Sequence, residues 1–396
     1  LTKQAFAKMD LSSLSSQLLA RASSDLSDGA SLMDLSAIEQ LKGNLSSGIA
    51  YQKAALERCN LYTVGKSKAE RLRLLVIAAP VSMGGNTPIE FLVNDSDVEI
   101  LTTFIAPDVA RVDPLPEFDL AFVAAPADCH QISKLETTTP AQTYLWEVER
   151  FIKDLNISVI NKPQEIFGLD RDRLPAKFKE AEKLIVPDVL RCNLDLIARL
   201  IQENGTEGFA DSSFPFVIRP IGSHAGYGLK LILNTQQLCE YLTKYKFADY
   251  FISPFIDYRS FDGLFRKYRI VFIDGKAYPC HMAIGKQWKL WYMNAGMNKD
   301  EWKRKEEEAF MSDFENTFAS RHQLQLDAIA DAIGLEYFGI DCGVDRAGNL
   351  VVFEADNALL VHDMDPVEIY PYKRPAMHRI FDAFTKMLFE KAGKFA

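Results

Sequence analysis

The feature that most constrains this chain of 396 residues is a hairpin pattern close to its C-terminal end. Two apolar runs, residues 337–341 and 350–354, flank the turn sequence Asp345-Arg-Ala-Gly348. Apolar runs of this length on either side of a glycine turn predict two antiparallel strands. Antiparallel pairing would bring the carboxylates of Asp341 and Glu354 side by side near the open ends of these strands.

These carboxylates predict a metal site. Asp356 alternates onto the same face as Glu354, so three acidic groups converge after otherwise apolar strands. They would repel one another strongly unless a cation neutralised them. Hard oxygen ligands of this kind suit Mg²⁺, which keeps several waters and bridges to phosphates. Regular pleating favours Asp356 as the third ligand, whereas a β-bulge would admit Asn357. A solvated strand end with surface carboxylates is the competing interpretation.

A glycine-rich stretch, residues 219–229, predicts phosphate binding. Its glycines would let a loop between two strands approach phosphate oxygens closely and present backbone N–H groups. An arginine at the end of the preceding strand supplies fixed positive charge, and a histidine in the loop offers a hydrogen bond. The candidates are Arg219, Gly222, Ser223, His224, Gly226 and Gly228. The chain has no Walker sequence, and a tight hairpin is the alternative explanation of the glycines.

Composition narrows the class of protein. The 45 basic and 54 acidic residues give a net charge of −9, which argues against a general nucleic-acid binder. The six cysteines include no C-x-x-C pair, so we expect free thiols and no zinc site. Neither an apolar run of membrane-spanning length nor a signal-peptide pattern is found, and we therefore expect no membrane association and a cytoplasmic location.

The chain divides into three predicted parts. Residues 1–66 are rich in Ser, Leu and Ala and predict two short amphipathic helices, within 32–41 and 45–56. This segment resembles one tetratricopeptide-type hairpin that could bind a peptide or protein partner. A helical cap on the main body is an equal alternative, because a single repeat is rarely stable. Residues 67–165 alternate short strands with helices and predict a small parallel sheet, and residues 166–396 form the remainder, which includes a predicted helix over 191–202.

Taken in order, these features resemble the ATP-grasp superfamily over about residues 70–396. The resemblance implies an α/β fold in which a small Rossmann-like parallel-sheet domain, residues 67–165, precedes two α+β subdomains that clamp ATP. Residues 166–260 would hold the nucleotide lid and hinge, and residues 261–396 the metal and substrate subdomain. Arg173 and Arg219 stand where the family has two nucleotide-contacting lysines, and Ser253, Phe255 and Ile256 would line the adenine slot.

A basic, aromatic stretch lies between the hinge and the acidic hairpin. It includes Lys267, Arg269, Lys286 and Lys289, and Asn294 follows it. The resemblance implies that Arg269 holds the γ-phosphate and an acyl-phosphate intermediate, with Lys286 and Asn294 as further catalytic candidates. The competing interpretation is a surface strand whose charges pair with residues 306–308.

The activity that this resemblance implies is an ATP- and Mg²⁺-dependent carboxylate–amine ligase acting on small-molecule or peptide substrates. Two alternatives remain open at this stage. One is a kinase of the same fold that phosphorylates a small anionic acceptor, for which the basic stretch is suited. The other is a non-catalytic nucleotide-binding module with a partner-binding helical arm, suggested by the arginines that replace the two lysines.

Overall fold

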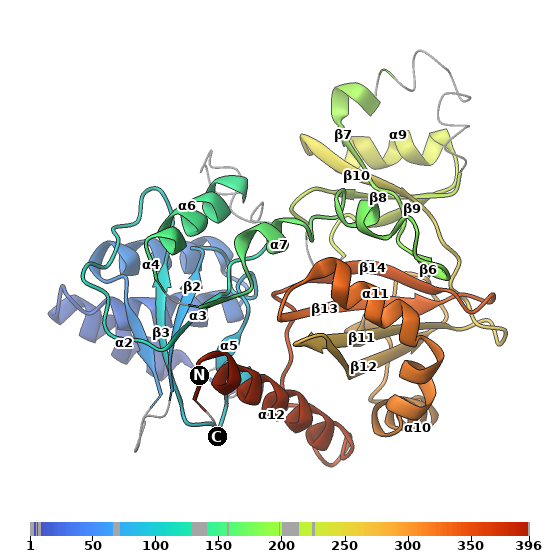
Figure 1. Cartoon of the computed structure of the whole chain (residues 1–396). Helices are drawn as coiled ribbons and strands as arrows, with labels where there is room; N and C mark the ends of the chain where they lie inside the picture. Colours follow the sequence, from blue (N-terminus) through green and yellow to red (C-terminus); the bar gives the residue numbers. More distant parts are fainter. Residues whose placement is uncertain are drawn as a thin grey trace.

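The computed structural model describes residues 4, 6, 9–65, 72–127, 141–156, 158–197, 199, 214–223 and 226–394. Three sheets organise this part of the chain, one largely parallel and two built mainly from antiparallel strands (Figure 1). This confirms the predicted order of a small parallel sheet followed by two α+β subdomains. In the described ranges, no helix combines the length and apolar character needed to cross a lipid bilayer.

The N-terminal helices pack against the first sheet. They are α2 (Ser12–Ser24), α3 (Gly29–Leu41) and α4 (Leu45–Arg58), and the latter two confirm the predicted pair. Strand β1 (Tyr62–Val64) then pairs antiparallel with β3 (Val98–Phe104). Leu56 of α4 shares a small apolar core with Ala78 and Phe104. The helices therefore cap the sheet, which is the second of the two sequence interpretations.

The first sheet has the strand order β1-β3-β2-β4-β5. Its parallel strands are β2 (Leu72–Ala78), β3, β4 (Leu120–Val123) and β5 (Val159–Ile160), and the helices nearby in sequence are α5 (Ile89–Leu92), α6 (Ala141–Lys153) and α7 (Pro163–Phe167). Six of the seven residues of β2 are buried, as expected for a parallel strand covered on both faces. The segments that follow β2 and β4 contact the residue after β14, because Thr87 donates to the backbone oxygen of Asn357 and Asn357 donates to that of Ala125.

The second sheet is small and antiparallel. Its strands are β7 (Leu190–Asn193), β8 (Phe216–Pro220), β9 (Lys230–Ile232) and β10 (Asp249–Pro254), in the order β7-β10-β8-β9, with helix α9 (Thr235–Lys244) beside them. The prediction of a helix over residues 191–202 is wrong for its first residues, because residues 190–193 form a strand that pairs with β10. Ile218, Leu238 and Tyr241 belong to a separate core under this sheet.

The third sheet carries the acidic hairpin. Its strands are β6 (Leu184–Ile185), β11 (Phe265–Ile273), β12 (Lys276–Gly285), β13 (Tyr337–Val344) and β14 (Leu350–Asp356), in the order β12-β11-β13-β14-β6. The short helices η2 (Leu174–Phe178), η3 (Tyr292–Asn294) and η4 (Glu315–Ala319) and the longer α10 (Glu301–Ser312) and α11 (Gln323–Ile333) surround it. Strands β13 and β14 pair antiparallel, which confirms the predicted hairpin.

The last helix joins the first and third sheets. Helix α12 (Lys373–Lys391) buries Phe384 completely, and its ring lies 5.8 Å from that of Phe122 in β4 and 5.2 Å from that of Tyr337 in β13. Figure 1 shows α12 in red below the third sheet, with one end beside α5. The first and third sheets therefore share one apolar core. The second sheet has a separate core.

Candidate active site

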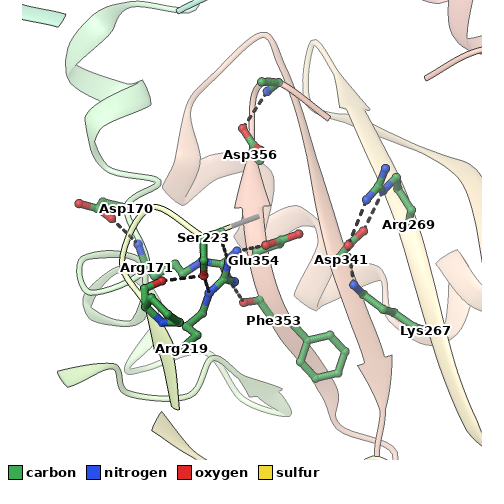
Figure 2. Close-up of polar contacts among 12 residues, drawn as sticks. Asp170, Arg171, Arg219, Ser223, Lys267, Arg269, Asp341, Phe353, Glu354 and Asp356 are labelled. Atoms are coloured by element: carbon green, nitrogen blue, oxygen red, sulfur yellow. Dashed lines mark hydrogen bonds and ion pairs between the residues drawn. The ribbon is translucent and has the colours of Figure 1, made fainter. Parts of the chain in front are cut away.

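A row of polar side chains crosses the third sheet. Arg269 of β11 is the register partner of Asp341 in β13, and Asp341 is in turn the partner of Glu354 in β14. Directly opposed residues in antiparallel strands project from the same face, with Cβ atoms about 5 Å apart. Backbone pairing alone therefore places one guanidinium and two carboxylates side by side, as Figure 2 shows.

Asp341 is the most enclosed member of this row, with only 2% of its surface exposed. Its Oδ1 accepts a hydrogen bond from Nε of Arg269 at 2.8 Å, and its Oδ2 lies 2.7 Å from Nζ of Lys267. Burial alone would raise the pKa of Asp341, but the two cations outweigh it and hold that pKa well below its ordinary value. The carboxylate is therefore ionised at neutral pH.

Glu354 is matched by a cation from a different part of the chain. Arg171, which precedes η2, pairs with the carboxylate of Glu354 and also donates from Nη1 to the backbone oxygen of Phe353 at 3.2 Å. Burial would raise the pKa of Glu354, but Arg171 lowers it below the usual value. Asp356 behaves differently, since burial and the neighbouring Glu354 raise its pKa to about 6.

A second set of cations lies at the glycine-rich loop, Arg219 from the second sheet and Lys289 from the segment that follows β12. Arg219 at the end of β8 donates through Nε to Oγ of Ser223 at 3.3 Å and also bonds the Ser223 backbone oxygen. Lys289 donates to the backbone oxygen of Leu229 at 3.1 Å, and burial together with Arg219 lowers its pKa. These contacts hold two positive charges against the glycine-rich loop.

A cavity of about 490 Å³ lies between the second and third sheets and contains all of these groups. Its charged lining consists of Asp170, Arg171, Arg219, Lys267, Arg269, Lys289, Asp341, Glu354 and Asp356. Apolar side chains such as Leu174, Val186 and Val352 also line it, together with residues 253–256. A cavity that combines apolar lining with convergent polar groups is typical of a small-molecule or cofactor site.

Several residues predicted from the sequence line this cavity. Among the nucleotide candidates they are Arg219, Ser223, Gly226, Ser253, Phe255 and Ile256, and among the catalytic and metal candidates they are Arg269, Asp341, Glu354 and Asp356. Gly228 instead shapes the loop, because a Cβ there would lie 2.6 Å from Cδ of Pro220. Gly222 takes a positive φ of 72° in the same turn without lining the cavity. His224 lies outside the described residues.

Other predicted residues are placed elsewhere. The guanidinium of Arg173 stacks 3.4 Å from the ring centre of Phe167, away from the cavity lining, and Lys286 is exposed. Asn294 does not line the cavity either, but it holds the turn that carries Lys289 by donating to the Lys289 backbone oxygen at 2.9 Å. Arg171 and Lys289 line the cavity, whereas Arg173 and Lys286 do not.

Asn357 is not on the cavity face. Its Nδ2 donates to the backbone oxygen of Ala125 at 2.9 Å, and the residue is fully buried. The register slip between β13 and β14 falls between Asp341 and Cys342, and beyond it the pairing of Asp341 with Glu354 and of Gly339 with Asp356 is regular. Regular alternation therefore puts Asp356 on the cavity side and turns Asn357 towards the first sheet.

The acidic residues fit a divalent cation by their chemistry. Among the described residues, no group of three acidic, histidine or cysteine side chains is already close enough to enclose a metal ion. Mg²⁺ does not need such a cage, because it is usually held by one or two carboxylates together with waters and substrate phosphates. Asp341 and Glu354, ionised and directly opposed, supply that pair, and Asp356 is next on the same face.

Comparisons with known proteins give structural matches only. No protein-family model and no curated relative matches the chain. A RimK-domain ATP-grasp protein of Sphaerobacter thermophilus is similar over 80% of this chain and 99% of its own, at 13% identity and a TM-score of 0.44. A D-alanine–D-alanine ligase of Bacillus anthracis is similar over 81% of this chain and 99% of its own, at 13% identity and a TM-score of 0.45.

A third similar structure is the ATP-grasp ligase PsnB, complexed with a precursor peptide and AMPPNP. It covers 82% of this chain and 100% of its own, at 12% identity and a TM-score of 0.42. All three are described as ATP-grasp proteins or ligases, the class that the resemblance in the sequence named.

Proposed function

We propose that this chain is an ATP- and Mg²⁺-dependent ligase that joins a carboxylate to an amine through an acyl phosphate. The observation that carries the proposal is the row Arg269–Asp341–Glu354, which shares with Arg219 a cavity that apolar side chains also line. The charged lining holds five basic and four acidic side chains. Such a lining suits a triphosphate accompanied by a divalent cation better than it suits an uncharged ligand.

Each part of the cavity has a task in this proposal. The apolar part beside residues 253–256 would take the adenine, and Arg219 and Lys289 would hold phosphate oxygens against the glycine-rich loop. Asp341 and Glu354 would hold Mg²⁺, which would offset negative charge on the phosphates. Binding of the metal and nucleotide would release Lys267, Arg269 and Arg171 from these carboxylates and so free their positive charge for phosphate oxygens.

The reaction needs no nucleophilic side chain. An oxygen of the substrate carboxylate would attack the γ-phosphorus, the bond to the β-phosphate oxygen would break, and ADP would leave. The amine would then attack the acyl carbon, lose a proton and displace phosphate, leaving an amide. Arg269 would stabilise the charge that develops on the transferred phosphoryl group and later on the acyl phosphate. Positioning and charge stabilisation would thus do most of the catalytic work.

The test is to supply Mg·ATP with mixtures of candidate acids, including amino acids and short peptides, and to add hydroxylamine as the amine. We expect ADP, free phosphate and a hydroxamate in equal amounts, because hydroxylamine traps an acyl phosphate. Omission of Mg²⁺ should abolish all three products. A stable phosphate ester without free phosphate would identify a kinase instead. Failure to form ADP with any acid would contradict the ligase activity.

Binding of the nucleotide gives a separate prediction. Arg219→Gln should weaken binding of the ATP analogue AMPPNP with Mg²⁺ by about 10- to 100-fold, the usual effect of losing a charge-assisted hydrogen bond. Arg173→Gln is the matched control and should change the affinity by less than about twofold, because Arg173 stacks on Phe167 outside the cavity. Calorimetric titration of both variants measures the difference. Equal losses in both would refute this assignment of the two arginines.

A further inference from the structure

The loop between β2 and α5, residues 79–88, forms a wall of the cavity. Gly84 and Gly85 line it, beside Leu359 and Leu360 that follow β14. The turn is closed by a hydrogen bond from the Gly85 N–H to the Ser82 oxygen at 2.9 Å, and Gly84 takes a φ of +84°. This wall is built from the first sheet and lies near the Asp356 end of β14.

Two glutamines of the N-terminal helices bond the backbone of this loop. Oε1 of Gln40 in α3 accepts a hydrogen bond from the Met83 N–H at 2.7 Å. Nε2 of Gln52 in α4 donates to the Val81 oxygen at 3.0 Å, and Gln52 is buried. A backbone N–H can only donate and a carbonyl can only accept, so these partners fix the orientation of each side-chain amide. One glutamine thus acts as acceptor and the other as donor.

The helices also hold the Gln40 side chain in place. Its Nε2 donates to Oγ of Ser36 one turn earlier at 3.0 Å. The backbone of α4 passes closely over it at Gly48, where a Cβ would lie only 2.3 Å from Cγ of Gln40. Close packing against a glycine leaves the glutamine little freedom to choose another rotamer. The contact to Met83 is therefore built into the helix pair.

The far end of the same loop is hydrogen-bonded to the residue that follows β14. Oγ1 of Thr87 donates to the backbone oxygen of Asn357 at 2.8 Å, in a fully buried position directly after Asp356. The loop is consequently fixed on one side by the helices and on the other by the end of β14. Asn86 supports it in the middle by bonding both the N–H and the oxygen of Ala79, at 2.9 and 2.8 Å.

We propose that Gln40 and Gln52 are positioning residues of the active site. Through Val81 and Met83 they set the wall at Gly84 and Gly85, and so the space open to the acid or amine beside the γ-phosphate. The N-terminal helices are then part of the enzyme's substrate-binding apparatus. This inference rests on the proposed function for the identity of the ligand, but the fixing of the loop can be measured without any substrate.

The acceptor and donor roles allow a matched pair of variants. Gln40→Glu keeps an oxygen for the Met83 N–H, and the Ser36 hydroxyl can donate to the second carboxylate oxygen. Gln52→Glu replaces a donor by a carboxylate that faces the Val81 oxygen and repels it. Gln40→Ala removes the contact at a half-buried position and is the second disruptive variant if Gln52→Glu does not fold. Lys53→Ala, exposed on α4, is the control.

The first measurement is amide hydrogen exchange of the full chain without nucleotide. We expect exchange at residues 81–86 to accelerate about tenfold in Gln52→Glu and Gln40→Ala, as for loss of one backbone-supporting hydrogen bond. It should stay at the wild-type rate in Gln40→Glu and Lys53→Ala. The affinity for Mg·AMPPNP should remain within about twofold in all four variants, because the nucleotide end of the cavity is built from other elements. Unchanged exchange in both disruptive variants would overturn the proposal.

The second measurement uses the acid that gives hydroxamate in the assay above. In Gln52→Glu and Gln40→Ala we expect KM for that acid to rise about tenfold while KM for ATP stays constant, with Gln40→Glu restoring the wild-type KM. Equal losses for the acid and ATP would overturn the positioning role. If no acid supports ADP formation, the proposed function fails, and hydrogen exchange alone still decides whether the two glutamines fix the loop.

Discussion

Replacement of Arg269 by alanine should lower the rate of ADP formation by about 10²- to 10³-fold, the usual cost of removing one preorganised donor to developing charge. Arg269 reaches the cavity from β11 and is held there by Asp341, through contacts of 2.8 and 3.1 Å. Asp341 keeps Lys267 as a counterion in this variant, so the fold should survive. Affinity for Mg·AMPPNP should change by less than about threefold, because Arg219 and Lys289 remain.

Two further variants sharpen this result. Arg269→Lys keeps the charge but loses the planar fork, and should recover only part of the rate. Arg266→Ala is the control on the same strand, since Arg266 pairs with Asp262 and Glu306 and does not line the cavity. Its rate should stay within about twofold of wild type. A loss of nucleotide affinity as large as the loss of rate in Arg269→Ala would contradict a role confined to phosphoryl transfer.

The second large effect concerns stability. Glu307 is fully buried on α10 and accepts hydrogen bonds from Tyr292, Tyr372 and the Met282 N–H, at 2.9, 2.6 and 3.0 Å. Lys373, 5% exposed at the start of α12, lies 3.6 Å from its Oε1. Lys373→Met would leave this carboxylate without its cation, and the free energy of unfolding should fall by about 3–5 kcal/mol.

Urea unfolding of three variants checks this expectation. Combining Lys373→Met with Glu307→Gln should restore much of the lost stability, because no buried charge then remains unpaired. The same lysine-to-methionine change at Lys305, whose pair with Glu301 is exposed, should leave the urea midpoint close to that of wild type. If Lys373→Met unfolds at the same urea concentration as Lys305→Met, the buried pair does not hold α10 and α12 together.

The hairpin of the acidic residues was predictable because local rules determine it. A glycine turn sets the register, and the register fixes which side chains share a face, so Asp341, Glu354 and Asp356 could be placed from sequence alone. Arg269 was predicted from family resemblance, and its pairing with Asp341 follows the same logic of register. These are residues whose positions depend on strand pairing within one sheet.

The residues missed by sequence analysis depend on contacts between distant segments. Arg171 lies in an irregular segment, and only the packing of that segment on β14 brings it to Glu354. The start of β7 was read as helix because its partner, β10, is about 60 residues away in sequence. The bonds of Gln40 and Gln52 join the N-terminal helices to a loop that no local pattern connects with them.

The position of α12 also has a consequence for synthesis of the protein. Phe122 in β4 and Tyr337 in β13 both complete their packing on Phe384, close to the end of the described chain. At ribosomal rates of about 5–20 residues per second, β4 waits on the order of tens of seconds for this partner. The apolar face that α12 will cover is thus exposed on the nascent chain, where chaperones that recognise apolar surface would act, and loss of α12 would remove the ring on which residues of both sheets pack.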